Sequence, residues 1–290
     1  MPITEHQRQN RGKHIGASEA AAILGLNPWK TAYDCWLEKT GKVELPVSIG
    51  EAGDIGNMVE NGLLDHAASE LGVKIIKNQA RVHKDGILSA THDALVVDKQ
   101  EGLEAKTSGI MNPFAAKDGW GEPETDEIPP HILIQVQQQM LVSNLEVVHV
   151  PALIGGRGRL MYHVERSEEL CAIILERVTL FWTENVLKDI PPEGLPSLEI
   201  VRFRKREPGL ILPIPAELVV VWQTIAKQKK EVSKAEDEAK AACVAAMGEA
   251  ETGESSAGNV VVQKIHRKGY TVKESDGVRV SFQKPKLLKE

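Results

Sequence analysis

The stretch that decides the expected fold is residues 89–108, SATHDALVVDKQEGLEAKTS. Its apolar and β-branched residues predict one strand over 87–97 and a second over 102–107, separated by a turn. A shorter strand is predicted before them, over 73–76. Strands this rich in Leu and Val are typical of a largely buried sheet.

Three charged side chains fall at informative places in these strands. Asp93 lies in the first, and Glu104 and Lys106 lie in the second. Residues two apart on a strand point to the same face, and a short turn between the strands brings Asp93 beside that face. The pattern therefore predicts two carboxylates and one ammonium group in one place.

This set of groups suits phosphodiester hydrolysis. Hard divalent cations prefer oxygen ligands, activate water and stabilise charge on phosphate oxygens. Asp93, Glu104 and the backbone carbonyl of Ala105 are the predicted ligands of Mg²⁺ or Mn²⁺, and Lys106 is expected to orient or help deprotonate the attacking water. The alternative is a solvated strand face with a Glu–Lys pair. Buried carboxylates, however, are rare unless they are paired or bound to a cation.

Helices are expected on both sides of this strand region. Ser18 and Thr31 are predicted N-caps of two short helices, and Ser167 of a third. The expected helices cover 19–25, 32–40, 52–71, 131–144 and 168–185, and a hairpin is expected over 147–154 and 160–164. The prediction is an α/β fold, a central mixed sheet flanked by helices.

The C-terminal part differs in composition. Pro191 and Pro192 mark a boundary, so the expected domains are 1–190 and 191–290. Beyond the boundary come a basic, strand-like VRFRKR segment and a long polar helix over 216–247, and a small hairpin is expected in the tail over 259–290. The segment is a candidate contact for backbone phosphates, and the helix for self-association, DNA or a partner; packing on its own domain is the alternative.

The overall composition excludes several classes of protein. The net charge is −6, and the three cysteines form no CxxC pair, so neither a zinc knuckle nor a disulfide framework is expected. Residues 1–200 carry an acidic excess and residues 201–290 a basic one, a mild pointer to a charged ligand. No apolar run is long enough for a membrane span, and the polar N-terminus is not a secretory signal. We expect a cytoplasmic protein, in a bacterial or phage-infected host cell.

Several separate motifs in the same order resemble a known family. They are RGKHIGASEAAAILGLNPWKT, GNMVENGLLDHAASELG, ATHDALV, LEAKTS and IQVQQQMLVSN. Together they resemble the YqaJ-type viral recombinase family, which includes phage lambda exonuclease, within the PD-(D/E)xK nuclease superfamily. The similarity covers about residues 11–185. Two departures are His92 where the family has proline, and Thr107-Ser108 where it has Cys-Pro.

The resemblance assigns roles to individual residues. Asp93, Glu104 and Lys106 match the catalytic trio, Glu60 matches a helix glutamate facing the metals, and Gln135 matches the first glutamine of a Q-x-Q motif. Three further residues match positions near a terminal 5′-phosphate of DNA: Arg11, Ser18 and Thr91. The alternatives are a helix-surface acid for Glu60, a polar helix face for the glutamines and a terminal tail for Arg11.

The family resemblance also implies an activity. It implies a Mg²⁺-dependent exonuclease, with two metal ions, that degrades linear double-stranded DNA from 5′ to 3′ and supplies single strands to an annealing protein in phage-type recombination. It further implies a ring-shaped homo-oligomer, a trimer. The alternatives are a structure- or sequence-selective endonuclease on the same fold and a catalytically idle DNA-binding protein.

Aromatic residues suggest one further possibility. Trp29, Phe114 and Trp120 are candidates to stack on a splayed base or to wedge a duplex end. Trp120, in the long Gly- and Pro-rich loop over 108–129, is the strongest of the three by sequence position.

Overall fold

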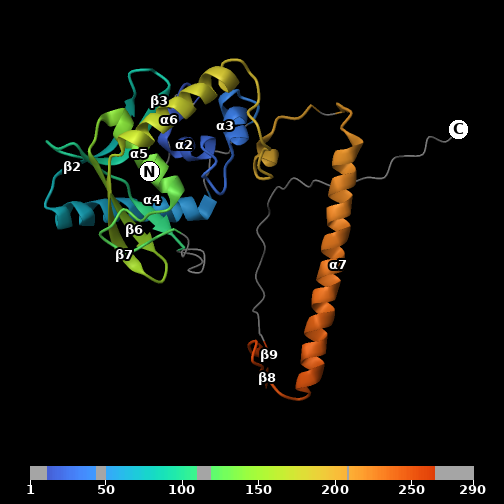
Figure 1. The fold of residues 1–290 in the computed structure, drawn as a ribbon. Coiled ribbons are helices and arrows are strands. Elements are labelled where there is room, and N and C mark those ends of the chain that lie inside the picture. The colour runs from blue at the N-terminus through green and yellow to red at the C-terminus, as the bar shows by residue number, and fades with distance from the viewer. Residues whose placement is uncertain (1–11, 44–49, 110–118, 208, 265–290) are drawn as a thin grey trace. The chain divides into compact units, whose positions relative to one another are not determined.

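The computed structural model describes residues 12–43, 50–109, 119–207 and 209–264 (Figure 1). These residues form two compact units, which divide between Lys205 and Arg206. The first unit thus reaches beyond the boundary predicted at residue 190. The reason is packing: Ile200 is buried in the core of the first unit, and Asp34 Oδ1 accepts a hydrogen bond from the Ser197 amide at 2.8 Å.

A mixed seven-stranded sheet forms the centre of the first unit. The strands are β1 (Ile15–Gly16), β2 (Ile75–Val82), β3 (Leu88–Val96), β4 (Glu101–Leu103), β5 (Lys106–Ser108), β6 (Val147–Ile154) and β7 (Gly158–Glu165). β2 and β4 run antiparallel to β3, whereas β4 and β5 run parallel to β6, and β7 closes a hairpin with β6.

The two central strands form as their composition predicts. Along β3, the residues at even positions from Leu88 to Val96 are all buried, which matches a strand with one face in the core. β2 begins at Ile75 and continues to Val82, so the strand predicted over 73–76 was placed too early and too short. It extends because it pairs with β3 along its length except at Asn78.

The helices of the first unit follow the predicted pattern closely. They are α2 (Ala17–Ile23), α3 (Ala32–Lys39), α4 (Gly50–Leu71), α5 (Pro130–Ser143) and α6 (Glu168–Phe181), which continues into a π-helical turn, Trp182–Val186. The N-caps predicted at Thr31 and Ser167 are confirmed, since their hydroxyl oxygens accept the Asp34 and Leu170 amides. Ser18 is not a cap: α2 is capped by Gly16, whose amide donates to Glu19 Oε2.

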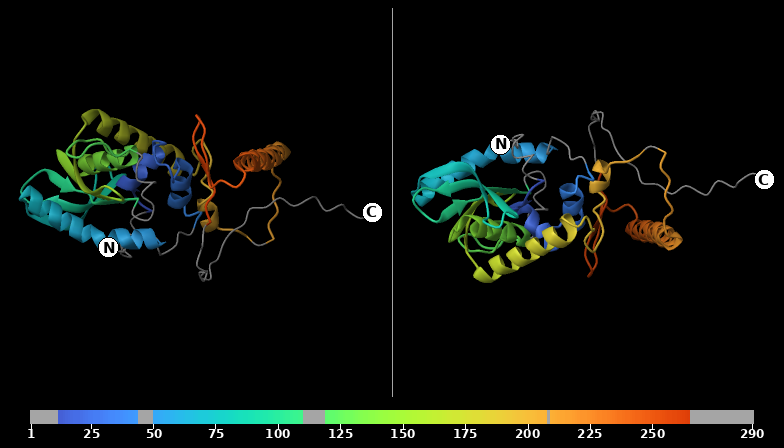
Figure 2. Two further views of the ribbon diagram at one scale, coloured as in Figure 1. Left: turned by 90° about the horizontal axis from the view of Figure 1, so that it is seen from below. Right: turned by 90° about the horizontal axis from the view of Figure 1, so that it is seen from above.

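The sheet lies between two helical layers (Figure 2). On one side α4 buries Leu64 and Ala67 against Ala94, Val96 and Leu103 of the sheet. On the other side α5 packs on β6 through a separate apolar cluster, and α2 and α6 pack against α5. This is the expected mixed sheet flanked by helices.

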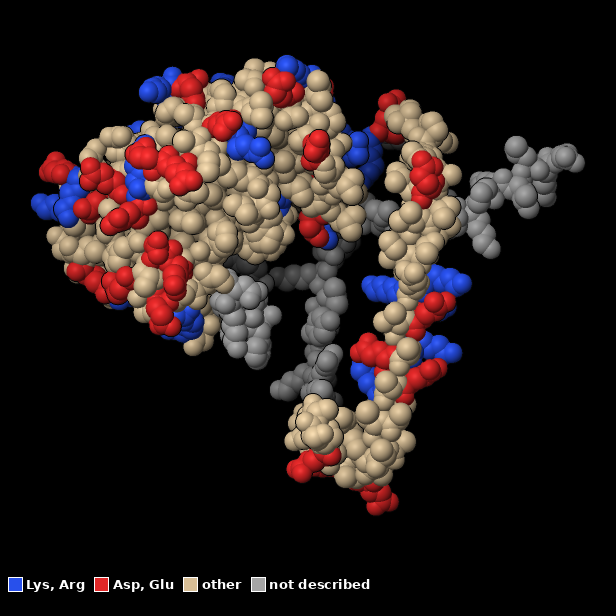
Figure 3. Space-filling model, viewed as in Figure 1, with Lys and Arg blue, Asp and Glu red and all other residues tan. Residues whose placement is uncertain are grey.

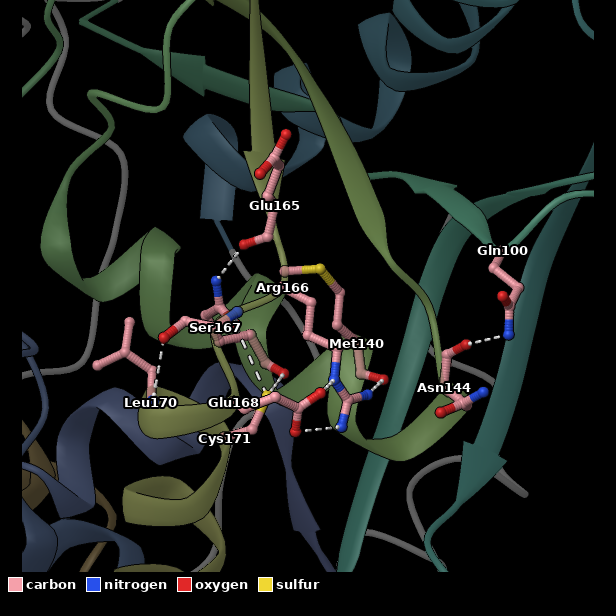
Figure 4. A network of polar contacts seen from close by, with 10 residues as sticks. Gln100, Met140, Asn144, Glu165, Arg166, Ser167, Glu168, Leu170 and Cys171 are labelled. Carbon is pink, nitrogen blue, oxygen red and sulfur yellow. Dashed lines mark hydrogen bonds and ion pairs between the residues drawn. The ribbon is translucent and has the colours of Figure 1, made fainter.

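A polar network fixes the passage from β7 into α6 (Figure 4). Arg166 donates to the Met140 carbonyl at 2.9 Å and to Glu168 at 2.6 Å. Gln137 donates to the Glu165 carbonyl and accepts from the Ser167 amide, at 2.8 and 2.9 Å. Side chains of α5 thus hold the end of β7 and the start of α6 in one position.

The second unit consists mainly of one helix, α7 (Ala216–Met247), followed by two short paired strands, β8 (Thr252–Gly253) and β9 (Val260–Val261). No residue of α7 is buried, and its Lys and Glu side chains form ion pairs four residues apart. Acidic and basic side chains are mixed along it (Figure 3).

The VRFRKR segment is not a strand, because Ile200–Phe203 form a 3₁₀ turn. No helix in the described ranges is long and apolar enough to cross a membrane.

Candidate active site

The three charged residues predicted to meet do lie together. Asp93 Oδ2 accepts a hydrogen bond from the Ala105 amide at 2.8 Å. Lys106 Nζ donates to Glu104 Oε1 at 2.6 Å. Glu104 is only 3% exposed, so the alternative of a solvated strand face is wrong.

The trio occupies a place where strand pairing lapses. The β3–β4 ladder ends at the pair Ala94–Leu103, so Asp93 and Glu104, which come next in the antiparallel register, are not paired. On the β6 side, the register places Ala105 opposite Pro151, which has no N–H to donate. The Ala105 amide itself donates to the Asp93 carboxylate. Such a gap lets side chains of neighbouring strands converge without leaving a backbone donor unpaired.

The opposite edge of β3 is also irregular at this point. The pairs Lys77–Ala94 and Gln79–His92 place Asn78 opposite Asp93. Asn78 has φ of 55°, in the left-handed region, which a non-glycine residue adopts at a cost. The sequence offered only a weak signal for this residue, since asparagine is among the few that tolerate such a conformation.

Glutamines of α5 surround Glu104 from the other layer. Gln135 binds both Glu104 Oε1 and Lys106 Nζ, and Gln139 donates to Glu104 Oε2 at 2.7 Å and to the Thr91 carbonyl at 3.2 Å. Gln138 donates to the carbonyls of Ile15 and Ser89. The contact of Gln135 agrees with its predicted place. The sequence did not predict a role for Gln139. Consecutive glutamines do not form a single stripe along a helix, so their spacing does not indicate which groups they bind.

These glutamines are not a polar helix face. Gln137, Gln138 and Gln139 are each at most 1% exposed. They satisfy backbone carbonyls of β1, β3 and β7 where the sheet splits, as buried polar groups must. The same helix therefore binds backbone carbonyls of the sheet and fixes the Glu104 carboxylate.

Glu60 lies on α4, on the approach to the same site. Its side chain is half-buried, and its charge acts on both Asp93 and Lys106. One turn earlier, Gly56 sits close to β5: a Cβ atom there would lie 3.6 Å from Thr107 Oγ1. This short separation shows that α4 lies close to the strand that carries Lys106, and Glu60 is within electrostatic reach of the site.

Burial and neighbouring charges shift the pKa values of Asp93 and Lys106. Burial raises the pKa of Asp93, and the Glu104 charge raises it further, to well above the usual carboxyl range. Burial alone would lower the pKa of Lys106, but the Glu104 and Asp93 charges outweigh burial and raise it. Perturbed groups of this kind gather at functional sites.

The donor set is compatible with a hard divalent cation. Two carboxylates and a backbone carbonyl are oxygen ligands, and Mg²⁺ is commonly held by one or two carboxylates with water and substrate completing its shell. Within the described residues no group of three His, Cys, Asp or Glu side chains is gathered closely enough to hold an ion alone. Asp93, Glu104 and the Ala105 carbonyl fit as a partial shell; Glu60 as a direct ligand stays a prediction.

The structure describes two of the three predicted phosphate-binding residues. Arg11 lies outside the described residues. Ser18 is exposed in the first turn of α2, directly after β1, which pairs with Leu88 and Ser89 of β3. Thr91 is exposed on β3, two residues before Asp93. Ser18 therefore follows a strand that pairs with β3, Thr91 lies on β3 itself, and the role of both stays a prediction.

Two other sequence interpretations are resolved by packing. Trp120 is 7% exposed and packs on Tyr162, so it is wrong as a surface wedge. Its loop is instead fastened to the β6–β7 turn by Arg157, which donates to the Trp120 and Gly121 carbonyls. His92 is buried against α5, with Nε2 2.7 Å from Ser143 Oγ, as a structural residue.

With this geometry in place, the chain can be compared with known proteins. Residues 6–146 match the family described as the YqaJ-like viral recombinase domain. That segment contains Asp93, Glu104, Lys106 and Gln135. Over this segment the chain resembles a YqaJ-like viral recombinase domain. The resemblance noted from the motifs is thereby confirmed.

Two kinds of relative are similar to this chain, one in sequence and one in fold. The uncharacterized protein YqaJ of Bacillus subtilis (strain 168) is 33% identical over 181 residues, which cover 61% of this chain and 54% of that protein. The match thus spans about half the length of that relative. Two crystal structures of LHK-Exo, an alkaline exonuclease from Laribacter hongkongensis, share the fold of the YqaJ-like domain. The one in complex with dAMP has a TM-score of 0.52 at 18% identity and covers 64% of this chain and 94% of that one.

Proposed function

We propose that this chain is a metal-dependent DNA exonuclease that hydrolyses phosphodiester bonds with Asp93, Glu104 and Lys106. One observation carries the proposal: two acidic side chains and one ammonium group from adjacent strands meet at a gap in the sheet, where the pKa of Asp93 is raised. The family assignment and the shared fold with an alkaline exonuclease support the same activity.

Each residue has a chemical task in this proposal. Asp93 and Glu104 hold Mg²⁺ or Mn²⁺, with the Ala105 carbonyl and, from α4, Glu60. The chemistry that such an ion supplies when bound is Lewis-acid stabilisation of the negative charge on the phosphate. Lys106 Nζ, positioned by Glu104 and Gln135, orients the attacking water. Two metal ions are proposed, which would stabilise both attacking and leaving oxygens.

The proposed substrate is the end of linear double-stranded DNA, degraded from 5′ to 3′. Ser18, Thr91 and Arg11 are proposed to bind the terminal 5′-phosphate. The resulting single strand would pass to an annealing protein in phage-type recombination. A ring-shaped homo-oligomer, a trimer, is the proposed assembly.

The test is digestion of an end-labelled linear duplex beside a closed circle. We expect the linear duplex to be degraded in Mg²⁺ but not in EDTA, faster with a 5′-phosphate than without one, and the circle to stay intact. Asp93→Ala should abolish degradation. Cutting of the circle would favour the endonuclease alternative, and an Asp93→Ala rate equal to wild type would refute the site.

A further inference from the structure

One aromatic ring near the site has no structural role in the core. Trp29 lies in the loop between α2 and α3 and is 70% exposed. Tryptophan is a large, mostly apolar side chain that proteins usually bury to a high degree. Of the three aromatic residues considered from sequence, Trp120 is buried and Phe114 lies outside the described residues, so Trp29 remains.

The loop that carries Trp29 is held in place. Asn27 Oδ1 accepts hydrogen bonds from the amides of both Trp29 and Lys30, at 2.9 and 3.0 Å. Lys30 is tied to Glu38 at 2.6 Å, and Thr31 caps α3. An aromatic side chain on a fixed backbone loses little conformational freedom when a ligand binds to it.

The indole ring points to the active site through one contact. Its centroid lies 5.0 Å from that of the His131 ring, and the two planes are perpendicular, at 86°. His131 is in the first turn of α5, four residues before Gln135. Residues four apart are neighbours on one helix face, and Gln135 binds Lys106 and Glu104. Trp29 is therefore linked to the catalytic residues through His131 and, one helical turn further along α5, Gln135.

Electrostatics agree with this position. Burial and the Lys106 charge lower the pKa of His131, which shows that the two side chains are within electrostatic reach. The lowered pKa favours the neutral imidazole, which contacts the indole ring without adding a charge beside it.

We propose that Trp29 is a base-stacking platform, which holds a nucleobase of the strand being cut beside the catalytic residues. The ligand class is a nucleobase because all four bases offer a flat π-face, and stacking on an aromatic ring is tolerant of sequence. An exonuclease must hold each successive nucleotide in turn, so a sequence-tolerant contact suits it. The inference rests on the proposed function.

The test pairs a change in the protein with a change in the DNA. Binding of a 3′-labelled duplex is measured by fluorescence anisotropy in EDTA, with gel analysis to verify that the DNA stays intact. The cut strand carries a single abasic nucleotide at successive positions from its 5′ end. The proteins are full-length wild type, Trp29→Ala and Leu26→Ala, which removes another exposed apolar side chain from the same loop.

We expect Trp29→Ala to weaken binding of intact DNA by about ten-fold, the scale of one base–aromatic stack. At one position, the abasic nucleotide should weaken DNA binding by the wild type by a similar factor. At that same position it should not weaken DNA binding by Trp29→Ala any further. Leu26→Ala should bind as wild type. Trp29→Phe should retain most of the affinity, since a smaller aromatic face remains.

Several results would overturn the proposal. Unchanged DNA binding by Trp29→Ala would assign the exposed ring to another partner, such as a protein. The effects of Trp29→Ala and of the abasic nucleotide on DNA affinity could instead add at every position, or Leu26→Ala could lose as much affinity as Trp29→Ala. Either result would point to a general disturbance of the loop. Wild-type protein that neither binds nor digests DNA would refute the proposed function as well, whereas normal digestion with an unaffected Trp29→Ala refutes stacking alone.

Discussion

At the scale of single residues, the site combines catalytic potential with local instability. Asp93 is held by the Ala105 amide but placed among the charges of Glu104 and Glu60. A carboxylate whose pKa is raised in the folded protein is less stable as an anion there than in the unfolded chain. The fold therefore loses stability as pH rises from the ordinary carboxyl range through the raised pKa of Asp93.

Asp93→Asn is expected to stabilise the protein while removing its activity. The amide oxygen can still accept from Ala105, and the charge repulsion disappears. We expect a free energy of unfolding higher by about 1 kcal/mol in EDTA, with the gain larger at pH 8 than at pH 4.5, and nuclease activity lower by about a hundred-fold or more. Thermal unfolding with and without Mg²⁺ checks this. A variant less stable than wild type at pH 8 in EDTA would contradict it.

His92 predicts the opposite dependence on pH. Burial lowers its pKa from 6.5 to about 4, so the unfolded chain takes up a proton at a higher pH than the folded protein does. The stability contributed by neutral His92 is lost as pH falls from 6.5 to 4, by about 3 kcal/mol in full.

His92→Gln should therefore reduce this loss. Urea unfolding of wild type and variant at pH 7 and pH 4.5 measures it, and comparing the two proteins cancels the contribution of Asp93. If wild type and variant lost the same free energy of unfolding between pH 7 and pH 4.5, His92 would not titrate as its burial indicates.

At the scale of elements, α5 stabilises the sheet through buried glutamine side chains. Gln138 donates to the carbonyls of Ile15 and Ser89 at 2.9 and 3.0 Å, and joins β1 and β3 at the point where α2 begins. A buried carbonyl that loses its donor costs free energy comparable to a lost hydrogen bond or more. This helix is thus a structural support for the site as well as a cover of the sheet.

Gln138→Leu should destabilise the first unit by about 2 kcal/mol, since two buried carbonyls lose their donor. Chemical denaturation measures the change. Gln228→Leu on the exposed surface of α7 is the control and should change stability by less than about 0.5 kcal/mol. Equal effects of the two substitutions would mean that the hydrogen bonds of Gln138 contribute nothing net.

At the scale of the whole molecule, the described parts of the site belong to the first unit. Asp93, Glu104, Lys106 and Gln135 all precede Lys205, and so does Trp29. The segment after residue 190 still contributes to the core through Ile200, and Val43 forms an isolated β-bridge with Arg204. The end of the first unit is therefore set by packing and not by the prolines.

Two truncated proteins test this boundary. A chain of residues 1–205 should unfold cooperatively, with a Tm within a few degrees of the same transition in the full chain. A chain of residues 1–190 should have a Tm lower by several degrees, because burial of Ile200 alone contributes about 2 kcal/mol. Calorimetry measures both. An equal Tm for the two would place the boundary at 190.

The sequence alone determined the features that depend on neighbours along the chain. The alternation around Asp93, the i, i+2 relation of Glu104 and Lys106, the caps at Thr31 and Ser167 and the ordered family motifs all follow from local periodicity and short-range hydrogen bonding. The tertiary structure alone decided which groups become buried and which partners they find. The glutamines of α5, the left-handed Asn78 opposite Asp93 and the burial of Trp120 beside the exposure of Trp29 depend on contacts between distant segments, and spacing along a single chain does not specify those.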